Sequence, residues 1–93
     1  MSLVSPNIAR DFIYIDDMVD AYLKIEELRK YQGMVFNIGT GTQSTIKHVV
    51  KTAFEITNKK ISLEWGRMEP RSWDTTSWVA DISLAKKLLK WKP

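Results

Sequence analysis

A chain of 93 residues with 44% hydrophobic residues and a formal net charge of +3 is long enough for one small domain with a modest core. It contains no cysteine, which excludes a disulfide scaffold, a thiolate metal site and a cysteine nucleophile. Its apolar runs are only a few residues long, so we predict no membrane span. The start shows no signal-peptide pattern, and residues 1–3 are a candidate leader, so we expect a cytoplasmic protein.

The charges are distributed unevenly along the chain. Residues 1–31 carry four basic and six acidic side chains, whereas residues 45–93 carry ten basic and five acidic ones. A basic half of this kind suits nucleic acid or another phosphate-bearing partner. It equally suits lysines that lie solvated near helix ends, as at residues 59–60 and 86–87.

The first third of the chain predicts a strand followed by a helix. Residues 12–15 form a short apolar run that favours a strand. Asp16 and Asp17 follow, and we expect them to cap a helix and to face the positive end of its dipole. Apolar residues then recur at helical spacing, and Gly33 is placed to end the helix in a left-handed conformation. The stripe consists of Met18, Ala21, Tyr22, Ile25 and Leu28.

The middle of the chain predicts a second strand, a second helix and a third strand. Residues 34–38 favour a strand, which the turn at residues 39–41 ends. Ser44 is the predicted N-cap of a helix that closes at residues 57–58. Residues 61–65 alternate with period two, as a half-buried strand does. The apolar face of the helix consists of Ile46, Val49, Val50, Ala53 and Phe54.

The last part of the chain predicts a long loop and a short helix. Residues 66–78 show no periodicity, and a loop of this length is usually functional or disordered. A helix that begins at Asp81 or Ser83 follows, with Ala85, Leu88 and Leu89 facing inward. The order β-α-β-α-β-loop-α predicts an α/β or α+β fold. Three strands leave open sheet edges, through which we expect the chain to self-associate.

The segment at residues 39–44, Gly-Thr-Gly-Thr-Gln-Ser, is similar to a phosphate-binding turn. It follows a predicted strand and opens a predicted helix, as the turn of a dinucleotide-binding unit does. Ser44, however, stands where that motif has its third glycine, and glycine pairs are common in plain turns. The pattern therefore favours a tight turn over a cofactor site. Asn37, just before it, is either a turn-capping residue or a ligand contact.

Arginines and an acid give the strongest chemical signal. Arg10 precedes a predicted strand, and Arg67, Arg71 and Asp74 lie in the long loop. Guanidinium groups bind phosphate oxygens in a bidentate manner, so these positions suit an anionic ligand that also carries a ring. His48 is the only histidine and lies off the apolar stripe, so we expect it to face solvent and predict neither a metal site nor a catalytic triad.

Three tryptophans, Trp65, Trp73 and Trp78, flank or lie within the long loop. Tryptophans in a small domain more often belong to the core, but these can also stack on a base or a sugar. Two binding modules therefore stay open as alternatives to an enzyme part. One is a stand-alone nucleotide-binding module. The other is a basic module for single-stranded nucleic acid, whose affinity would fall steeply with salt.

Several segments together resemble one family. Residues 10–17, Arg-Asp-Phe-Ile-Tyr-Ile-Asp-Asp, and residues 35–41, Val-Phe-Asn-Ile-Gly-Thr-Gly, resemble successive landmarks of the extended short-chain dehydrogenase/reductases, the nucleotide-sugar epimerase/dehydratase group. Residues 71–74 resemble the late Arg-x-x-Asp loop of that family, and residues 80–93 its closing helix. The landmarks follow the family order and cover nearly all of the chain. The resemblance implies the C-terminal, substrate-binding part of such an enzyme, an incomplete Rossmann-type domain.

The resemblance also implies roles for four residues. Arg10 and Arg71 would bind the diphosphate of a nucleotide-sugar, and Asp74 would contact the ribose of the nucleoside. Asn37 would lie near the nucleotide end of the pocket. The parent enzyme would use NAD or NADP, whereas no cofactor is expected on this part alone, because the resemblance makes residues 39–41 a late turn of the family and not its cofactor-binding turn.

Two departures from the family pattern bear on function. Residues 72–73, Ser-Trp, stand where the family loop usually has Pro-Gly, which changes the pocket wall and leaves the substrate open. The early glycine-rich fingerprint and the Tyr-x-x-x-Lys pair are absent, since Tyr14 and Tyr22 are followed four residues on by Met18 and Glu26. No catalytic residue is therefore predicted. We expect the chain to require an N-terminal Rossmann domain and to catalyse nothing alone.

Overall fold

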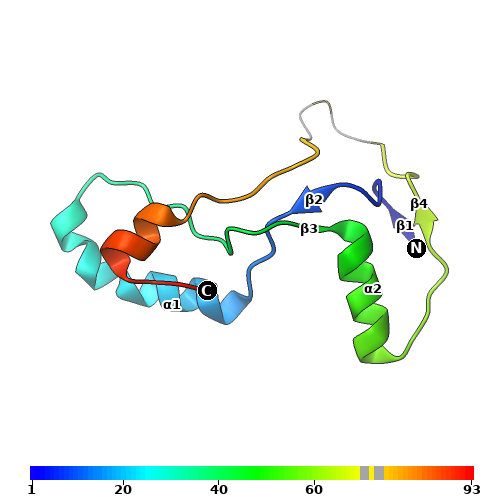
Figure 1. Cartoon of the computed structure of the whole chain (residues 1–93), viewed down its shortest axis with the longest axis horizontal. Helices are drawn as coiled ribbons and strands as arrows, with labels where there is room; N and C mark the ends of the chain where they lie inside the picture. Colours follow the sequence, from blue (N-terminus) through cyan, green and yellow to red (C-terminus); the bar gives the residue numbers. More distant parts are fainter. Residues whose placement is uncertain (70–71, 73–74) are drawn as a thin grey trace. The chain divides into compact units, whose positions relative to one another are not determined.

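The computed structural model describes residues 1–69, 72 and 75–93, with residues 25–28 described by their backbone alone. The chain forms two compact units, each built from two stretches of sequence (Figure 1). The first unit contains Met1–Arg10 and Gln43–Trp78, and the second contains Asp11–Thr42 and Val79–Pro93. The chain therefore passes between the units three times.

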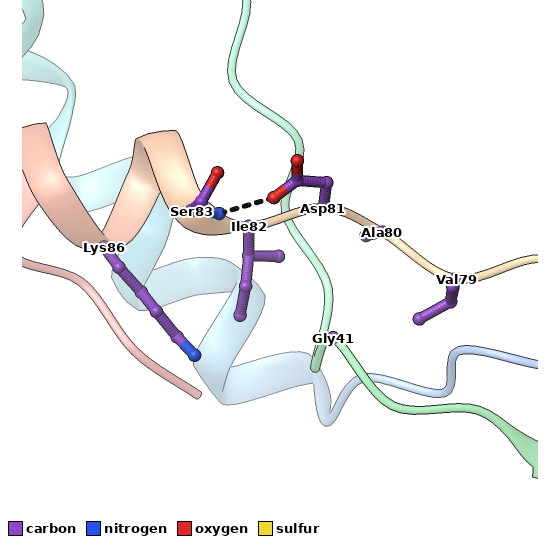
Figure 2. A pocket seen from close by; sticks show the side chains of 7 residues that line it. All are labelled: Gly41, Val79, Ala80, Asp81, Ile82, Ser83 and Lys86. Atoms are coloured by element: carbon purple, nitrogen blue, oxygen red, sulfur yellow. Dashed lines mark hydrogen bonds between the residues drawn. The ribbon is translucent and has the colours of Figure 1, made fainter.

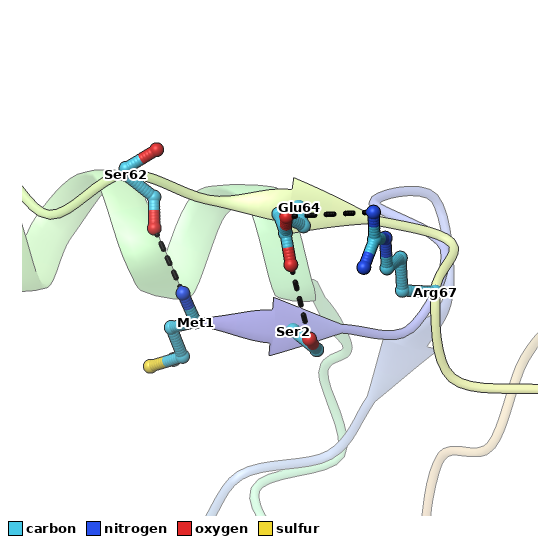
Figure 3. A network of polar contacts seen from close by, with 5 residues as sticks. All are labelled: Met1, Ser2, Ser62, Glu64 and Arg67. Carbon is cyan, nitrogen blue, oxygen red and sulfur yellow. Dashed lines mark hydrogen bonds and ion pairs between the residues drawn. The ribbon is translucent and has the colours of Figure 1, made fainter.

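The first unit holds two short strand pairs and one long helix. Strand β1 (Ser2–Leu3) pairs in parallel with β4 (Glu64–Trp65), and β2 (Ala9–Arg10) pairs antiparallel with β3 (Ser44–Thr45). Polar contacts reinforce the first pair: the N-terminal amine of Met1 donates to Ser62 O over 3.0 Å, and Ser2 Oγ donates to Glu64 Oε2 over 3.3 Å (Figure 3). The ends of the stretch 1–10 are thereby fastened to residues far along the sequence.

Helix α2 (Ile46–Thr57) begins directly after β3. Its N-cap is Thr45, whose hydroxyl accepts a hydrogen bond from the His48 backbone N–H over 3.2 Å. The predicted cap, Ser44, is one residue early, because the helix begins at Ile46 and Thr45, although it also lies in β3, is the residue directly before it. The helix ends as predicted, at Asn58, which adopts the left-handed conformation with φ of 52°.

The second unit packs three helical elements around a small core. They are α1 (Ile15–Leu23), the 3-10 helix η1 (Lys24–Tyr31) and the π-helical turn η2 (Ala85–Leu89). The core consists of Ala21, Ala85, Leu89 and Trp91, against which Ile13, Phe36 and Ile38 pack. The Trp91 indole Nε1 also donates to Asp17 O over 3.2 Å, so the end of the chain is tied to α1.

Two predicted strands of the second unit do not form. Residues 12–14 have no strand pairing and α1 already begins at Ile15, while residues 34–38 are irregular. A strand requires a hydrogen-bonded neighbour, and the described part of the chain pairs none with these segments. Residues 34–38 nevertheless keep an alternating pattern, with Phe36 and Ile38 partly buried and Val35 81% exposed. The third predicted strand, at residues 61–65, shortens to β4, because only Glu64 and Trp65 pair with a neighbouring strand.

The helix ends of the second unit can be compared with the capping residues predicted from the sequence. Gly33 has a φ of +80°, which confirms its left-handed conformation after η1. Asp16 and Asp17 do not cap α1, because its N-cap is Tyr14 and no side chain bonds there; both acids lie in the first turn, near the positive end of the dipole. Asp81 Oδ1 accepts from the Ser83 N–H over 3.0 Å, just before η2, whose own N-cap, Leu84, makes no side-chain bond. Within the described residues, no helix has the length and hydropathy needed to cross a bilayer.

Candidate functional site

Arg10 lies at the end of β2, where its guanidinium is held by carbonyl oxygens. Its Nη1 donates to Ala9 O and to Thr75 O, each over 2.8 Å. The side chain is half-buried, and its position in β2 follows from pairing with Ser44 of β3. Two bonds from one nitrogen fix the plane of the guanidinium, which is the preorganisation that a bidentate phosphate contact requires.

The end of the long loop is fastened to the same strand pair. The Ala9 N–H donates to Thr76 O over 3.0 Å, and Ser77 Oγ donates to Gln43 Oε1 over 2.8 Å. Together with the Arg10 bond to Thr75, these contacts form a strap at residues 75–77. Arg71 and Asp74, the two predicted loop contacts, lie outside the described residues. The strap begins one residue after Asp74.

Asn37 belongs to the second unit and lies beside an open hollow. Its side-chain Nδ2 donates to Asp81 O over 3.4 Å. Asp81 also lines a hollow of about 400 Å³, together with residues that include Gly41, Ile82 and Lys86 (Figure 2). Hydrogen bonds from the Ser83 side chain and backbone lower the pKa of Asp81, so its carboxylate gives the lining of the hollow a negative charge.

The Asp11 carboxylate ties three separated segments together. It accepts hydrogen bonds from the Thr40 N–H over 2.8 Å, the Gly41 N–H over 3.0 Å and the Ala80 N–H over 3.1 Å. The Thr40 hydroxyl is a fourth donor to the same group. Desolvation alone would raise the pKa of Asp11, but the hydrogen bonds from Thr40, Ala80 and Gly41 together outweigh it and lower the pKa. We call this arrangement the Asp11 knot.

The knot explains the glycine-rich turn at residues 39–41. A Cβ at Gly39 would lie 2.6 Å from the Ala80 Cβ and 2.7 Å from Asp11 Oδ2, so only glycine fits. The amides of Thr40 and Gly41 bond the Asp11 carboxylate, and they are therefore used within the protein. This confirms the prediction of a tight turn. The N–H groups that a dinucleotide phosphate would need are already bonded to Asp11.

The tryptophans divide between the core and the surface. Trp78 is 65% exposed and so does not belong to a core, whereas Trp65 is half-buried. Trp73 lies outside the described residues. Trp91, for which the sequence analysis predicted no role, is the buried one, at 3% exposure. An exposed indole next to the strap is available for stacking on a flat ligand.

Neither Asp11 nor Trp91 was predicted as a key residue. Asp11 carries no periodic signal, because its partners lie 29, 30 and 69 residues away in sequence. Trp91 stands near the end of the chain, beyond the last predicted helix. The predicted solvent exposure of His48 is confirmed, and the described residues contain no cluster of acidic or histidine ligands for a metal. Arg67 pairs with Glu64, its Nη2 lying 3.7 Å from Oε1, on the exposed edge of β4 (Figure 3).

Known proteins are similar to this chain in sequence and in fold. No family model matches the chain. The UDP-glucose 4-epimerase of Halalkalibacterium halodurans is 36% identical over 87 residues, which are 90% of this chain and 25% of that protein. The dTDP-4-dehydro-6-deoxyglucose reductase of Escherichia coli is 33% identical over 84 residues, which are 90% of this chain and 26% of that protein. The UDP-glucuronic acid 4-epimerase of Bacillus cereus, solved with UDP-glucuronic acid and NAD, superposes with a TM-score of 0.85 and 29% identity over 99% of this chain and 29% of that one.

The chain corresponds to one portion of the nucleotide-sugar epimerases. It spans about a quarter of the length of the curated relatives it matches. The match confirms the resemblance to extended short-chain dehydrogenase/reductases and the predicted class, a partial α/β fold. The segments at residues 12–14 and 34–38, which pair with no strand of the described chain, are consistent with a partial fold, since a strand requires a hydrogen-bonded neighbour.

Proposed function

We propose that the chain is the nucleotide-sugar-binding, C-terminal portion of an NAD- or NADP-dependent epimerase or dehydratase. In this role, Arg10 and Arg71 bind the diphosphate, Asp74 contacts the ribose, and Asn37 lies at the nucleotide end of the pocket. The observation that carries the proposal is the bond from Arg10 Nη1 to Thr75 O, which ties the arginine to the residue next to Asp74. Arg10 is thereby bonded to the segment that directly follows the predicted loop contacts in sequence.

The relatives support the same class of ligand. UDP-sugars or NAD are present in the solved epimerases that the chain matches at 26–30% identity. The cofactor belongs to the parent enzyme in this proposal, because the one glycine-rich turn of the described chain is closed by Asp11. The catalytic groups and the NAD site come from an N-terminal Rossmann domain, and residues 34–38 offer it an unpaired extended segment. The isolated chain is expected to show no turnover.

A titration of the isolated chain with UDP, UDP-glucose and NAD tests this function. In ¹⁵N-HSQC spectra, UDP and UDP-glucose are expected to shift the amides of Arg10 and of the strap at residues 75–77, and NAD to leave them in place. Nucleotide titrations that leave these amides unmoved would contradict the proposal. Saturable NAD binding would contradict the assignment of the cofactor to the missing portion.

Two matched arginine variants sharpen the test. Arg10→Lys keeps the charge but removes the bidentate geometry, and it is expected to weaken UDP binding about tenfold. Arg67→Lys makes the same change in the same unit, at an arginine that pairs with Glu64, and is expected to leave the affinity unchanged. Equal losses in both variants would show a general charge effect in place of a specific contact.

Nucleic acid is the second candidate ligand, and the exposed indole of Trp78 is what favours it. A short single-stranded oligonucleotide separates the two functions, since its affinity would fall steeply between low and moderate salt. The epimerase proposal predicts that UDP binds with much weaker salt dependence and that the oligonucleotide does not compete with it.

A further inference from the structure

Strand β2 has a neighbouring segment on each of its edges. On one edge it pairs with β3, and the Ile46 N–H donates to Ile8 O over 2.9 Å. On the other edge the Ala9 N–H donates to Thr76 O over 3.0 Å. The Ile8 carbonyl and the Ala9 N–H belong to one trans peptide unit and therefore point in opposite directions. The strap at residues 75–77 thus lies along β2 on the edge opposite β3.

The side chain of Gln43 fastens the last residue of the strap. Its Oε1 accepts a hydrogen bond from Ser77 Oγ over 2.8 Å. Gln43 directly precedes β3, so the pairing of β3 with β2 sets the position of its backbone. The bond therefore connects the β3 side of β2 with the strap on the opposite edge. We call this bond the Gln43–Ser77 latch.

The strap completes the hold on the Arg10 guanidinium. Nη1 of Arg10 donates to Ala9 O and to Thr75 O, each over 2.8 Å. Ala9 belongs to β2 itself, so its carbonyl stays within reach whether or not the strap is in place. Thr75 belongs to the strap, and its carbonyl leaves Arg10 if the strap leaves β2. The orientation of the guanidinium therefore depends on how firmly the strap is fastened.

We propose that Gln43 and Ser77 are positioning residues for nucleotide binding, which act by holding the strap that orients Arg10. This inference rests on the proposed role of Arg10 as a diphosphate contact. A guanidinium that is already oriented loses less conformational freedom when it binds a phosphate, so the latch raises the affinity without adding a contact. The latch is one exposed hydrogen bond, and its loss is expected to weaken nucleotide binding about threefold.

Variants of the two latch residues test the proposal in the full 93-residue chain. Ser77→Ala removes the donor, and Gln43→Met removes the acceptor at nearly constant side-chain length. In an NMR titration, each is expected to weaken UDP binding about threefold, and the double variant no more than either single one. Ser77→Thr retains a hydroxyl and is expected to bind UDP as the wild type does.

Two measurements separate positioning from a general structural role. In an Arg10→Lys background, Ser77→Ala is expected to cause no further loss of UDP affinity, because lysine has no planar group for the strap to orient. Without ligand, the heteronuclear NOE of the Arg10 side-chain Nε–Hε group is expected to fall in Ser77→Ala, since the side chain becomes more mobile on the picosecond to nanosecond timescale.

Thr57→Val is the matched control within the same unit. It removes another exposed hydroxyl, which donates to Ala53 O over 2.7 Å near the end of α2. This variant is expected to leave both the UDP affinity and the Arg10 NOE unchanged. Far-UV circular dichroism establishes that each variant is folded.

Two outcomes would overturn the proposal. One is a Ser77→Ala variant that keeps the wild-type UDP affinity or the wild-type Arg10 NOE. The other is an equal loss of UDP affinity in the Arg10→Lys background or in Thr57→Val, which would show a general loosening of the unit. A wild type that does not bind UDP would instead contradict the proposed function. The ligand-free NOE of Arg10 would then still decide whether the latch orients the arginine.

Discussion

The two units differ in how they are held together. Five of the six buried apolar residues of the described chain lie in the second unit: Ile82 and the core residues Ala21, Ala85, Leu89 and Trp91. The first unit has only Ala9, and its long helix α2 has no buried residue. The first unit instead depends on backbone pairing and on polar contacts such as the strap. A core stabilises the second unit, whereas the first is held mainly by hydrogen bonds that water can replace.

The largest expected loss of stability follows from truncating a core leucine of the second unit. Leu89 is 1% exposed, so Leu89→Ala is expected to cost about 3 kcal/mol and to unfold the second unit of so small a protein. Phe54→Ala, at a half-buried position of α2, is expected to cost about 1 kcal/mol. Urea denaturation followed by residue-resolved NMR measures both. Equal costs would mean that the two units share one cooperative core.

A pair of glycines tests the second unit's close packing. Gly39→Ala places a Cβ against Ala80 and Asp11 and is expected to cost about 2 kcal/mol. Gly66→Ala in the first unit meets no atom within 4 Å but must adopt a φ of +72°, which costs about 1 kcal/mol. Thermal unfolding of the two variants measures the difference. A tolerated Gly39→Ala would show that the Asp11 knot can open.

The Asp11 knot gives the second unit a pH dependence. The folded pKa of Asp11 lies below its ordinary value of 3.8, so its stabilisation is fully present above pH 3.8 and is lost as the pH falls through the folded pKa. Asp11→Asn is expected to lower the melting temperature at neutral pH and to flatten its fall in acid. Asp20→Asn, at an exposed aspartate of α1, is the control. If the melting temperature of Asp11→Asn fell in acid as steeply as that of the wild type, the role of the Asp11 knot would be contradicted.

The smallest expected effect concerns the cap of α2 in the first unit. Thr45→Ala removes the hydroxyl that accepts from the His48 N–H and is expected to cost about 1 kcal/mol. Thr45→Ser retains the acceptor and is expected to be nearly neutral. Amide exchange rates in the first turn of α2 report the loss directly. A change confined to the second unit would contradict the separation of the two units.

The sequence predicted the helices better than the strands, for a physical reason. Helical hydrogen bonds are local, so the spacing of apolar residues located both helical regions, and Asn58 located the end of α2. The region predicted as one helix up to Gly33 instead changes at Lys24 from α1 to the 3-10 helix η1. Strands depend on a neighbour, and the sequence of residues 34–38 carries no information about whether one is present. The same segment keeps the alternating exposure of a strand without its pairing.

The candidate site was predicted in part by composition and in part by resemblance. Arg10 and the late loop were identified from residue type, and the structure adds the strap that joins them. The Asp11 knot could not be predicted, because it depends on contacts between segments that are distant in sequence. The roles of Arg71 and Asp74 in binding a nucleotide-sugar stay predictions, because both residues lie outside the described part of the chain.

The interleaved order of the two units has a consequence for how such proteins diversify. Residues 43–78 form one continuous insertion between the two stretches of the second unit. The ends of those stretches already lie together, since Gly41 and Ala80 both bond Asp11. An insertion whose two ends meet on a stable base can be exchanged as a cassette. Because residues 1–10 pair with this segment through β1–β4 and β2–β3, transplanting residues 1–10 and 43–78 together from a related sequence would replace the first unit and its loop while the core of the second unit stayed intact.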